Sequence, residues 1–379
     1  MKRSILLSSP VFGAVSALAL AFALTGDASA DRIYLSNGSI LEDLEVKTET
    51  LSKVVYRVSG EKKDAEVASE LVLEIDYEKM PDDVASAEID AGDEAFGAAI
   101  SGMDDYLTNL GDKGDRKFKW APAYAHFRIV ELNKLGGNKD GMVAAVDALM
   151  IAAPDSRYVP LAMVEKIDTL MTLGDAAGAR EAIDAFSALV KSAGMPQRWE
   201  FESSVRRVAT NPTLKGEGLE KELAKIGKSA AAFPTVSNYA DVAIAESMLL
   251  RGELTDAEEL VRKVVADPNA PDRTLAAAWT TLGDCLFRQA EGMTAPDQKD
   301  ASIAMMKESL LAYMRVVVGF RFEYAYVAKA GFYAGRCFQE IGGAGSADNS
   351  SRLFRYVRSR FRGTSWANNA RDFDARNRK

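Results

Sequence analysis

Few residues in this chain have the types and spacing that catalysis needs. The sequence contains one histidine, His126, within a stretch of helical periodicity from residue 121 to residue 134. Metal sites built from several histidines are therefore excluded, and a lone histidine on a helix usually packs as a partly buried residue. The sequence also lacks a glycine-rich phosphate loop, an HExxH helix, a nucleophile elbow and a Cys-x-x-Cys pair. We expect no catalytic residue, no metal ion and no cofactor.

Two pairs of adjacent acidic residues are the remaining candidates for chemistry. Glycosidases use two carboxylates that flank the bond to be cleaved. Asp82-Asp83 and Asp104-Asp105 supply such groups, but exposed acids near the start of a helix usually interact with the helix dipole instead. Because two acids can meet in any fold, a hydrolase acting on a surface polymer stays an alternative.

Charge is distributed unevenly along the chain. The 379 residues carry a net charge of -8, which excludes nucleic acid as a partner of the whole molecule because phosphate binding needs a basic surface. The C-terminal segment 349–379 contains nine basic and only two acidic residues. Arg355, Arg358 and Arg362 follow one another at helical spacings of three and four, which predicts a basic ridge. We expect this ridge to hold an acidic peptide, an anionic lipid headgroup or a wall polymer, or else to be a solvated surface.

The first 30 residues have the three parts of a secretory signal. Lys2 and Arg3 give a positive start, residues 5–24 are apolar, and Ala28-Ser29-Ala30 provides the small residues required for cleavage. We expect cleavage after Ala30 and a periplasmic or secreted mature chain. The alternative is an uncleaved membrane anchor, since about twenty apolar residues can span a bilayer.

Residues 31–80 have the period of two that is typical of β-strands. Asn37-Gly38 is a dipeptide that favours a tight hairpin turn, and Ser59-Gly60 predicts a second turn. Four or five short strands in this segment predict a small barrel-like β domain or a curled sheet. We consider two roles for it: a docking module for an envelope component, or a cap over the first repeat. Pro81 marks its end.

From residue 85 to residue 379 the period becomes helical, with glycine or proline breaks every 15 to 25 residues. Three breaks look like copies of one joint, in which a Pro or Gly turn and a Ser or Thr N-cap precede an aromatic residue and alanines: Ala153–Tyr158, Phe233–Ala240 and Phe361–Ala367. The step from Pro234 to Pro268 is 34 residues. Short helices joined in this way predict antiparallel hairpins.

Two predicted helices carry a more specific motif. Trp279, Leu282 and Gly283 fit the W-x-x-L-G start of the first helix in a tetratricopeptide repeat, and Gly331, Ala334, Gly335 and Phe338 repeat the spacing. The chain thus resembles tetratricopeptide-repeat proteins, although residues 196–232 lack a signature and residues 290–299 look like an insertion. The resemblance implies a mostly α fold, a right-handed superhelix of antiparallel hairpins, in which the small Gly283 lets the paired helix approach.

The same resemblance implies the positions of site residues. In this family, ligand contacts come from first-helix positions on the concave face, which correspond here to Asp284, Phe287, Arg288, Arg336, Gln339 and Glu340. Cys285 and Cys337 take equivalent places in neighbouring repeats, usually too far apart for a disulfide, so two buried thiols are expected rather than a bridge.

Together these features predict a non-enzymatic interaction or scaffold protein of the bacterial cell envelope. Its expected ligand is another protein, bound on the concave face of the helical repeat array. A wall- or lipid-binding adaptor that uses the basic ridge is an alternative, besides the hydrolase.

Overall fold

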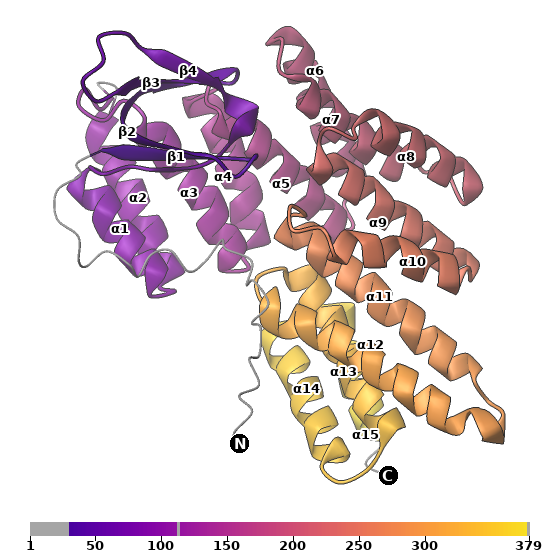
Figure 1. The fold of residues 1–379 in the computed structure, drawn as a ribbon. Helices are drawn as coiled ribbons and strands as arrows, with labels where there is room; N and C mark the ends of the chain where they lie inside the picture. Colours follow the sequence, from indigo (N-terminus) through magenta and orange to yellow (C-terminus); the bar gives the residue numbers. More distant parts are fainter. Residues whose placement is uncertain (1–29, 112–113, 377–379) are drawn as a thin grey trace, which may run out of the picture.

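The computed structural model describes residues 30–111 and 114–376. Within these ranges the chain forms a small antiparallel sheet followed by fifteen α-helices (Figure 1). The predicted signal segment, apart from Ala30, lies outside the described residues. None of the helices in these ranges combines the length and apolarity that a membrane crossing requires.

The N-terminal sheet has five strands in the order β4-β3-β2-β1-β5. The strands are β1 (Asp31–Leu35), β2 (Ile40–Glu49), β3 (Lys53–Val58), β4 (Ala65–Ala68) and β5 (Val72–Asp76). The predicted Asn37-Gly38 turn joins β1 to β2, with Gly38 at a φ of 82°. The prediction of a barrel is wrong, because β4 and β5 remain unpaired edges. Trp120 and Tyr124 from the helical region pack against the sheet's apolar core, so this face is covered without barrel closure.

The helical region begins directly after the sheet. Its helices are α1 (Asp82–Gly92), α2 (Phe96–Leu110), α3 (Ala121–Leu135), α4 (Lys139–Ala152), α5 (Tyr158–Leu173), α6 (Ala176–Ser192), α7 (Gln197–Ala209), α8 (Glu217–Ser229), α9 (Pro234–Arg251), α10 (Leu254–Val265), α11 (Asp272–Gly292), α12 (Lys299–Gly319), α13 (Tyr324–Ile341), α14 (Ser346–Arg360) and α15 (Ser365–Arg376). Each helix packs against the next one in the chain, and each odd-numbered helix also packs against the next odd-numbered helix. The odd-numbered helices therefore form one layer.

The predicted joints fall between helices. Ala153–Tyr158 connects α4 to α5, and the Ser156 hydroxyl accepts a hydrogen bond from the Tyr158 amide at 3.2 Å. At the last joint Thr364 likewise caps α15 through the Ala367 amide. The joint before α9 differs, because Phe233 takes the N-cap position and Pro234 opens the helix. Proline is tolerated there because its missing N–H would have no helical partner.

Two hairpins pack in an equivalent way. A Cβ atom added to Gly283 on α11 would lie 2.6 Å from the ring of Tyr313 on α12, and one added to Gly335 on α13 would lie 2.6 Å from the ring of Phe354 on α14. In both hairpins an aromatic side chain thus rests on a glycine of the preceding helix. The absence of a side chain lets the two helices approach closely.

Cys285 and Cys337 are both buried and free, as predicted. Burial raises the pKa of each thiol to about 12. The insertion predicted for residues 290–299 lengthens α11 and α12 to 21 residues each, joined by a loop that contains the one-turn helix η4 (Pro296–Gln298). In Figure 1 this hairpin extends beyond its neighbours.

The sheet is fixed to the first helical hairpins. Tyr77 stacks on Trp120 with ring centroids 3.5 Å apart, and Glu49 forms a buried ion pair with Arg157 at 2.5 Å. The Leu51 amide donates to the Asp155 carbonyl at 2.8 Å. The sheet thus covers the start of the helical region, as a cap would.

The beginning and the end of the helical region also meet. Tyr324, the first residue of α13, donates a hydrogen bond to the carbonyl of Leu135 at the end of α3 over 2.8 Å. Phe322 packs edge-on against Phe96 of α2 with ring centroids 6.0 Å apart. The stack of helices is therefore curved, so that the C-terminal hairpins reach back to the N-terminal ones (Figure 1).

Candidate functional site

The odd-numbered helices carry a group of buried and partly buried charged residues, here named the ionic cluster. Its members come from α3, α5, α7, α11 and the residue before α13: Lys134, Glu165, Asp168, Glu202, Arg206, Arg273 and Glu323. The Lys134 ammonium lies 3.0 Å from carboxylate oxygens of both Glu165 and Glu323. Because Glu323 directly precedes α13, Lys134 links the start of α13 to α3 and α5.

Arg206 is the best-satisfied cation of the ionic cluster. Its guanidinium donates two hydrogen bonds to Asp168, at 2.9 and 3.0 Å, and a third to Glu202 at 2.5 Å. Such bidentate, charge-assisted bonds are among the strongest in proteins. Burial alone would raise the pKa of Asp168, but Arg206 and Arg273 outweigh it and hold that pKa below its usual value. Each carboxylate of the cluster thus lies within ion-pair distance of at least one of its cations.

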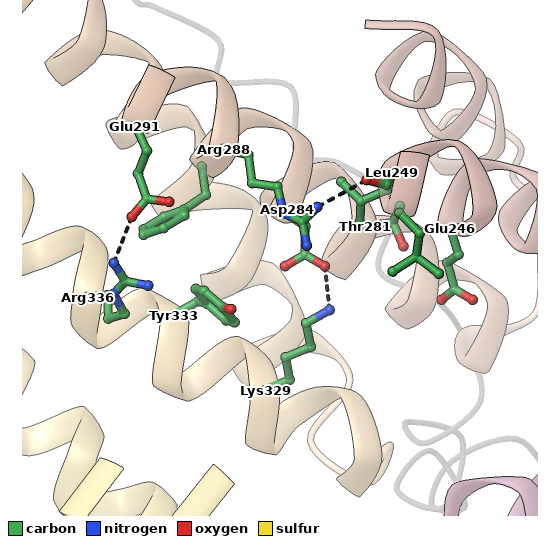
Figure 2. Close-up of a pocket in the computed structure, with 11 residues that line it drawn as sticks. Glu246, Leu249, Thr281, Asp284, Arg288, Glu291, Lys329, Tyr333 and Arg336 are labelled. Atoms are coloured by element: carbon green, nitrogen blue, oxygen red, sulfur yellow. Dashed lines mark hydrogen bonds and ion pairs between the residues drawn. The ribbon is translucent and has the colours of Figure 1, made fainter. Parts of the chain in front are cut away.

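Further along the same layer lies an open pocket of about 280 Å³. It is formed by α9, α11 and α13, whose lining residues are Glu246, Leu249, Leu250, Thr281, Asp284, Phe287, Arg288, Glu291, Lys329, Tyr333 and Arg336. Figure 2 shows Asp284 and Glu291 of α11 directed toward Lys329 and Arg336 of α13, respectively. We refer to this site as the inner pocket.

Most charged groups of the inner pocket have partners within it. Asp284 accepts a hydrogen bond from the buried Tyr313 hydroxyl at 2.7 Å and forms an ion pair with Lys329. Arg336 donates to Glu291 at 2.7 Å, and its guanidinium lies over the Phe287 ring, 4.6 Å from the centroid.

Glu246 is the exception. This α9 side chain is exposed at the pocket and makes no hydrogen bond or ion pair with the residues that the structure describes. In Figure 2 it stands apart from the paired groups. The protein around it desolvates the carboxyl group and raises its pKa, Lys329 opposes that shift, and Asp284 reinforces it. The Glu246 carboxylate can therefore form a hydrogen bond or an ion pair with a ligand.

The inner pocket contains four of the six residues expected on the concave face: Asp284, Phe287, Arg288 and Arg336. Gln339 and Glu340 do not line it, since they follow on the next turn of α13. Sequence reasoning missed Lys329 and Tyr333, which precede Arg336 by seven and three residues and share its helix face. It also missed Glu246 and Leu250, because α9 lacks the W-x-x-L-G motif that marks α11.

The predicted basic ridge is divided in the structure. Arg355 is exposed on α14, whereas Arg358 lies 3.3 Å from the buried Asp374 of α15. Helix α14 ends at Arg360, so Arg362 lies in the connection to α15 rather than on the same helix. The C-terminal segment is two packed helices, and residues 377–379 lie outside the described part.

The histidine and the acid pairs lie elsewhere. Asp82 and Asp83 occupy the first turn of α1, where the helix dipole favours them. Asp104 lies in the middle of α2 instead, and it lines a second pocket with His126 of α3. Burial lowers the pKa of His126, although Asp104 opposes this. No group of three or more potential metal ligands occurs in residues 30–111 and 114–376.

Comparison with known proteins assigns no family. No protein-family model matches the chain, and no curated protein is detectably similar in sequence.

Proposed function

We propose that this chain is a non-enzymatic interaction or scaffold protein of the cell envelope, and that another protein binds at the inner pocket. The proposal includes a tetratricopeptide-like right-handed superhelix whose concave face is the layer of odd-numbered helices. The observation that carries the proposal is a contrast within this layer. The charged residues of the ionic cluster pair with one another, whereas the inner pocket is open and contains a carboxylate, that of Glu246, without a partner among the described residues. The signal-like residues 1–30 support the assignment to the periplasm or the outside of the cell.

The inner pocket has the features of a contact point for a protein segment. Leu250 at its edge is 80% exposed, so it offers apolar surface to a partner beside the charged groups. Side chains from three successive hairpins converge there, so a bound segment would contact several repeats at once. Repeat proteins commonly bind extended partners over such surfaces.

The proposal is tested by crosslinking at the pocket. A photoreactive residue in place of Leu250 is expected to capture a specific protein from envelope fractions. The matched control is the same residue in place of Leu311 on α12, which is 64% exposed but outside the pocket. The proposal is contradicted if both positions capture the same proteins, or if neither captures any.

Hydrolysis of a surface polymer is a second candidate, which one observation favours. Glu246 and Asp284 line the same pocket, and the pKa of Glu246 is raised, as for a general acid beside an ionised carboxylate. Asp284 is already engaged by Tyr313 and Lys329, which argues against its use as a nucleophile or base. Release of soluble sugars from envelope polymer by the wild type but not by Glu246→Gln would favour the hydrolase over the scaffold.

A further inference from the structure

Two charged groups of the inner pocket, Glu246 and Arg288, have no oppositely charged partner among the described residues. Asp284 is neutralised by Lys329, and Glu291 by Arg336 at 2.7 Å. Arg288 donates to the Leu249 carbonyl at 3.0 Å, at the C-terminal end of α9, where a cation also interacts favourably with the helix dipole. Glu246 alone has neither an ion-pair partner nor a hydrogen-bond partner among the described residues.

The inner pocket is lined by three acidic and three basic side chains, and the charged groups that act on the Glu246 carboxylate are Lys329 and Asp284. From α11 comes the Asp284 carboxylate, and from α13 comes the Lys329 ammonium, which Asp284 already engages. The hydroxyl groups of Tyr239 on α9 and Tyr326 on α13 also interact electrostatically with Glu246. Burial raises the pKa of both tyrosines, so they remain neutral at pH 7. Because Lys329 is already paired with Asp284, the Glu246 carboxylate can accept a further cation.

The shape of the inner pocket suits a single long side chain. Its volume of about 280 Å³ lies at the lower end of the roughly 300–1,000 Å³ that is usual for ligand pockets. Leu250, one turn after Glu246 on α9, provides apolar surface on this side of the pocket, whereas Tyr333 lies at the other end beside Arg336 (Figure 2). Lysine and arginine side chains bury their aliphatic stems on apolar surface while the charged end reaches a polar partner.

We propose that the inner pocket binds an arginine or lysine side chain of the partner protein, with Glu246 as its counter-ion and Leu250 against its stem. This inference rests on the proposed function, because that function identifies the ligand as part of a protein. The chemistry itself, a cationic side chain on Glu246, is testable without the partner.

The test uses the full chain with methyl-labelled leucines and N-acetylarginine methylamide as the probe. Methyl NMR signals of Leu249 and Leu250 should shift saturably with this probe or with its lysine counterpart. The neutral citrulline analogue and the glutamate analogue should bind at least about tenfold more weakly, because they lack the charge-assisted bond. Absence of saturable shifts with both cationic probes overturns the proposal, as does equal binding of the citrulline analogue.

Two variants locate the interaction. Glu246→Gln should weaken the cationic probe about tenfold while the rest of the methyl spectrum stays unchanged. Glu340→Gln, on the exposed surface of α13 outside the pocket, should leave the affinity unchanged. Wild-type affinity in Glu246→Gln overturns the proposal.

Failure of this inference and failure of the proposed function are distinguishable. If the Leu250 crosslink captures a protein equally in the wild type and in Glu246→Gln, the cation inference fails and the protein-binding function stands. If the cationic probe binds through Glu246 but no protein is captured, the cation site stands and the protein-binding function fails.

Discussion

Two regions of the same helical layer differ in whether their acidic side chains are paired. In the ionic cluster, Arg206 and Arg273 hold the pKa of Asp168 below its usual value, so that this acid is ionised and paired. In the inner pocket, desolvation raises the pKa of Glu246, which has no partner in the described part of the chain. The ion pairs of the ionic cluster join helices to one another, whereas the Glu246 carboxylate of the inner pocket forms no ion pair with a described residue. A charge that the fold does not satisfy is available to a ligand.

The ionic cluster also differs from the inner pocket in what it connects. Lys134 bridges α5 and the start of α13, two elements that lie far apart in sequence. Pairs of this kind gain from mutual attraction but carry a large desolvation cost, so removal of one partner is far more harmful than the pair is beneficial. We therefore expect the largest effects of substitution in the ionic cluster.

The strongest prediction concerns Asp168. Replacing it in Asp168→Asn leaves the buried Arg206 with only Glu202 as a carboxylate partner, and we expect a loss of about 3–5 kcal/mol in the free energy of unfolding. Urea denaturation measures this loss. The matched control is Asp184→Asn, which removes an exposed pair with Arg207 at 3.0 Å and should cost about 0–1 kcal/mol. Equal losses in the two variants would contradict the assigned role of the ionic cluster.

A second prediction concerns the packing that supports the inner pocket. Gly283→Ala places a methyl group against the Tyr313 ring, whose hydroxyl holds Asp284. Overpacking of this kind costs about 1–3 kcal/mol, and thermal or urea unfolding measures it. Gly218→Ala on α8, where no atom lies within 4 Å of the new methyl group, should cause no loss. Comparable stability in both variants would show that the contact between α11 and α12 is looser than described.

The two regions should also respond oppositely to acid. The folded-state pKa of Asp168 is lowered, so its stabilising effect is present above the ordinary aspartate value of 3.8 and is lost as the pH falls through the folded-state pKa. The stability difference between the wild type and Asp168→Asn should therefore shrink below that value in a series of urea titrations. A difference that stays constant down to the acid transition would refute the lowered pKa.

The smallest stability effect is expected at Glu246. Its raised pKa means that the folded protein favours the neutral carboxyl group more than the unfolded chain does, so ionisation at neutral pH opposes folding. Glu246→Gln should accordingly be as stable as the wild type at pH 7, or slightly more stable, by urea denaturation. A loss comparable to that of Asp168→Asn would mean that Glu246 belongs to the structural pairs rather than to a binding site.

The sequence predicted much of the local structure because local signals carry it. The change from a period of two to a helical period located the boundary near Pro81, and the three proline or glycine joints located the starts of α5, α9 and α15. Gly283 and Gly335 identified the positions of close helix contact. These features depend on backbone conformation and on neighbours within one hairpin, which a linear pattern records.

The sequence also located part of the inner pocket. Asp284, Phe287, Arg288 and Arg336 follow from the repeat register. Gln339 and Glu340 were included because the register fixes a helix face but not the point along it where neighbouring helices leave a gap. The predicted basic ridge included Arg362 for a related reason. Spacing alone does not show that α14 ends at Arg360.

What the sequence determined by itself was the succession of a strand segment and helical hairpins, with the glycines and small residues that let the helices pack. Only the tertiary structure decided that the sheet stays open against Trp120, that Lys134 meets Glu323, and that Glu246 remains unpaired beside Asp284 and Lys329. The physical reason is that burial and charge pairing depend on residues brought together from distant hairpins, and the pattern within any one helix carries no record of them.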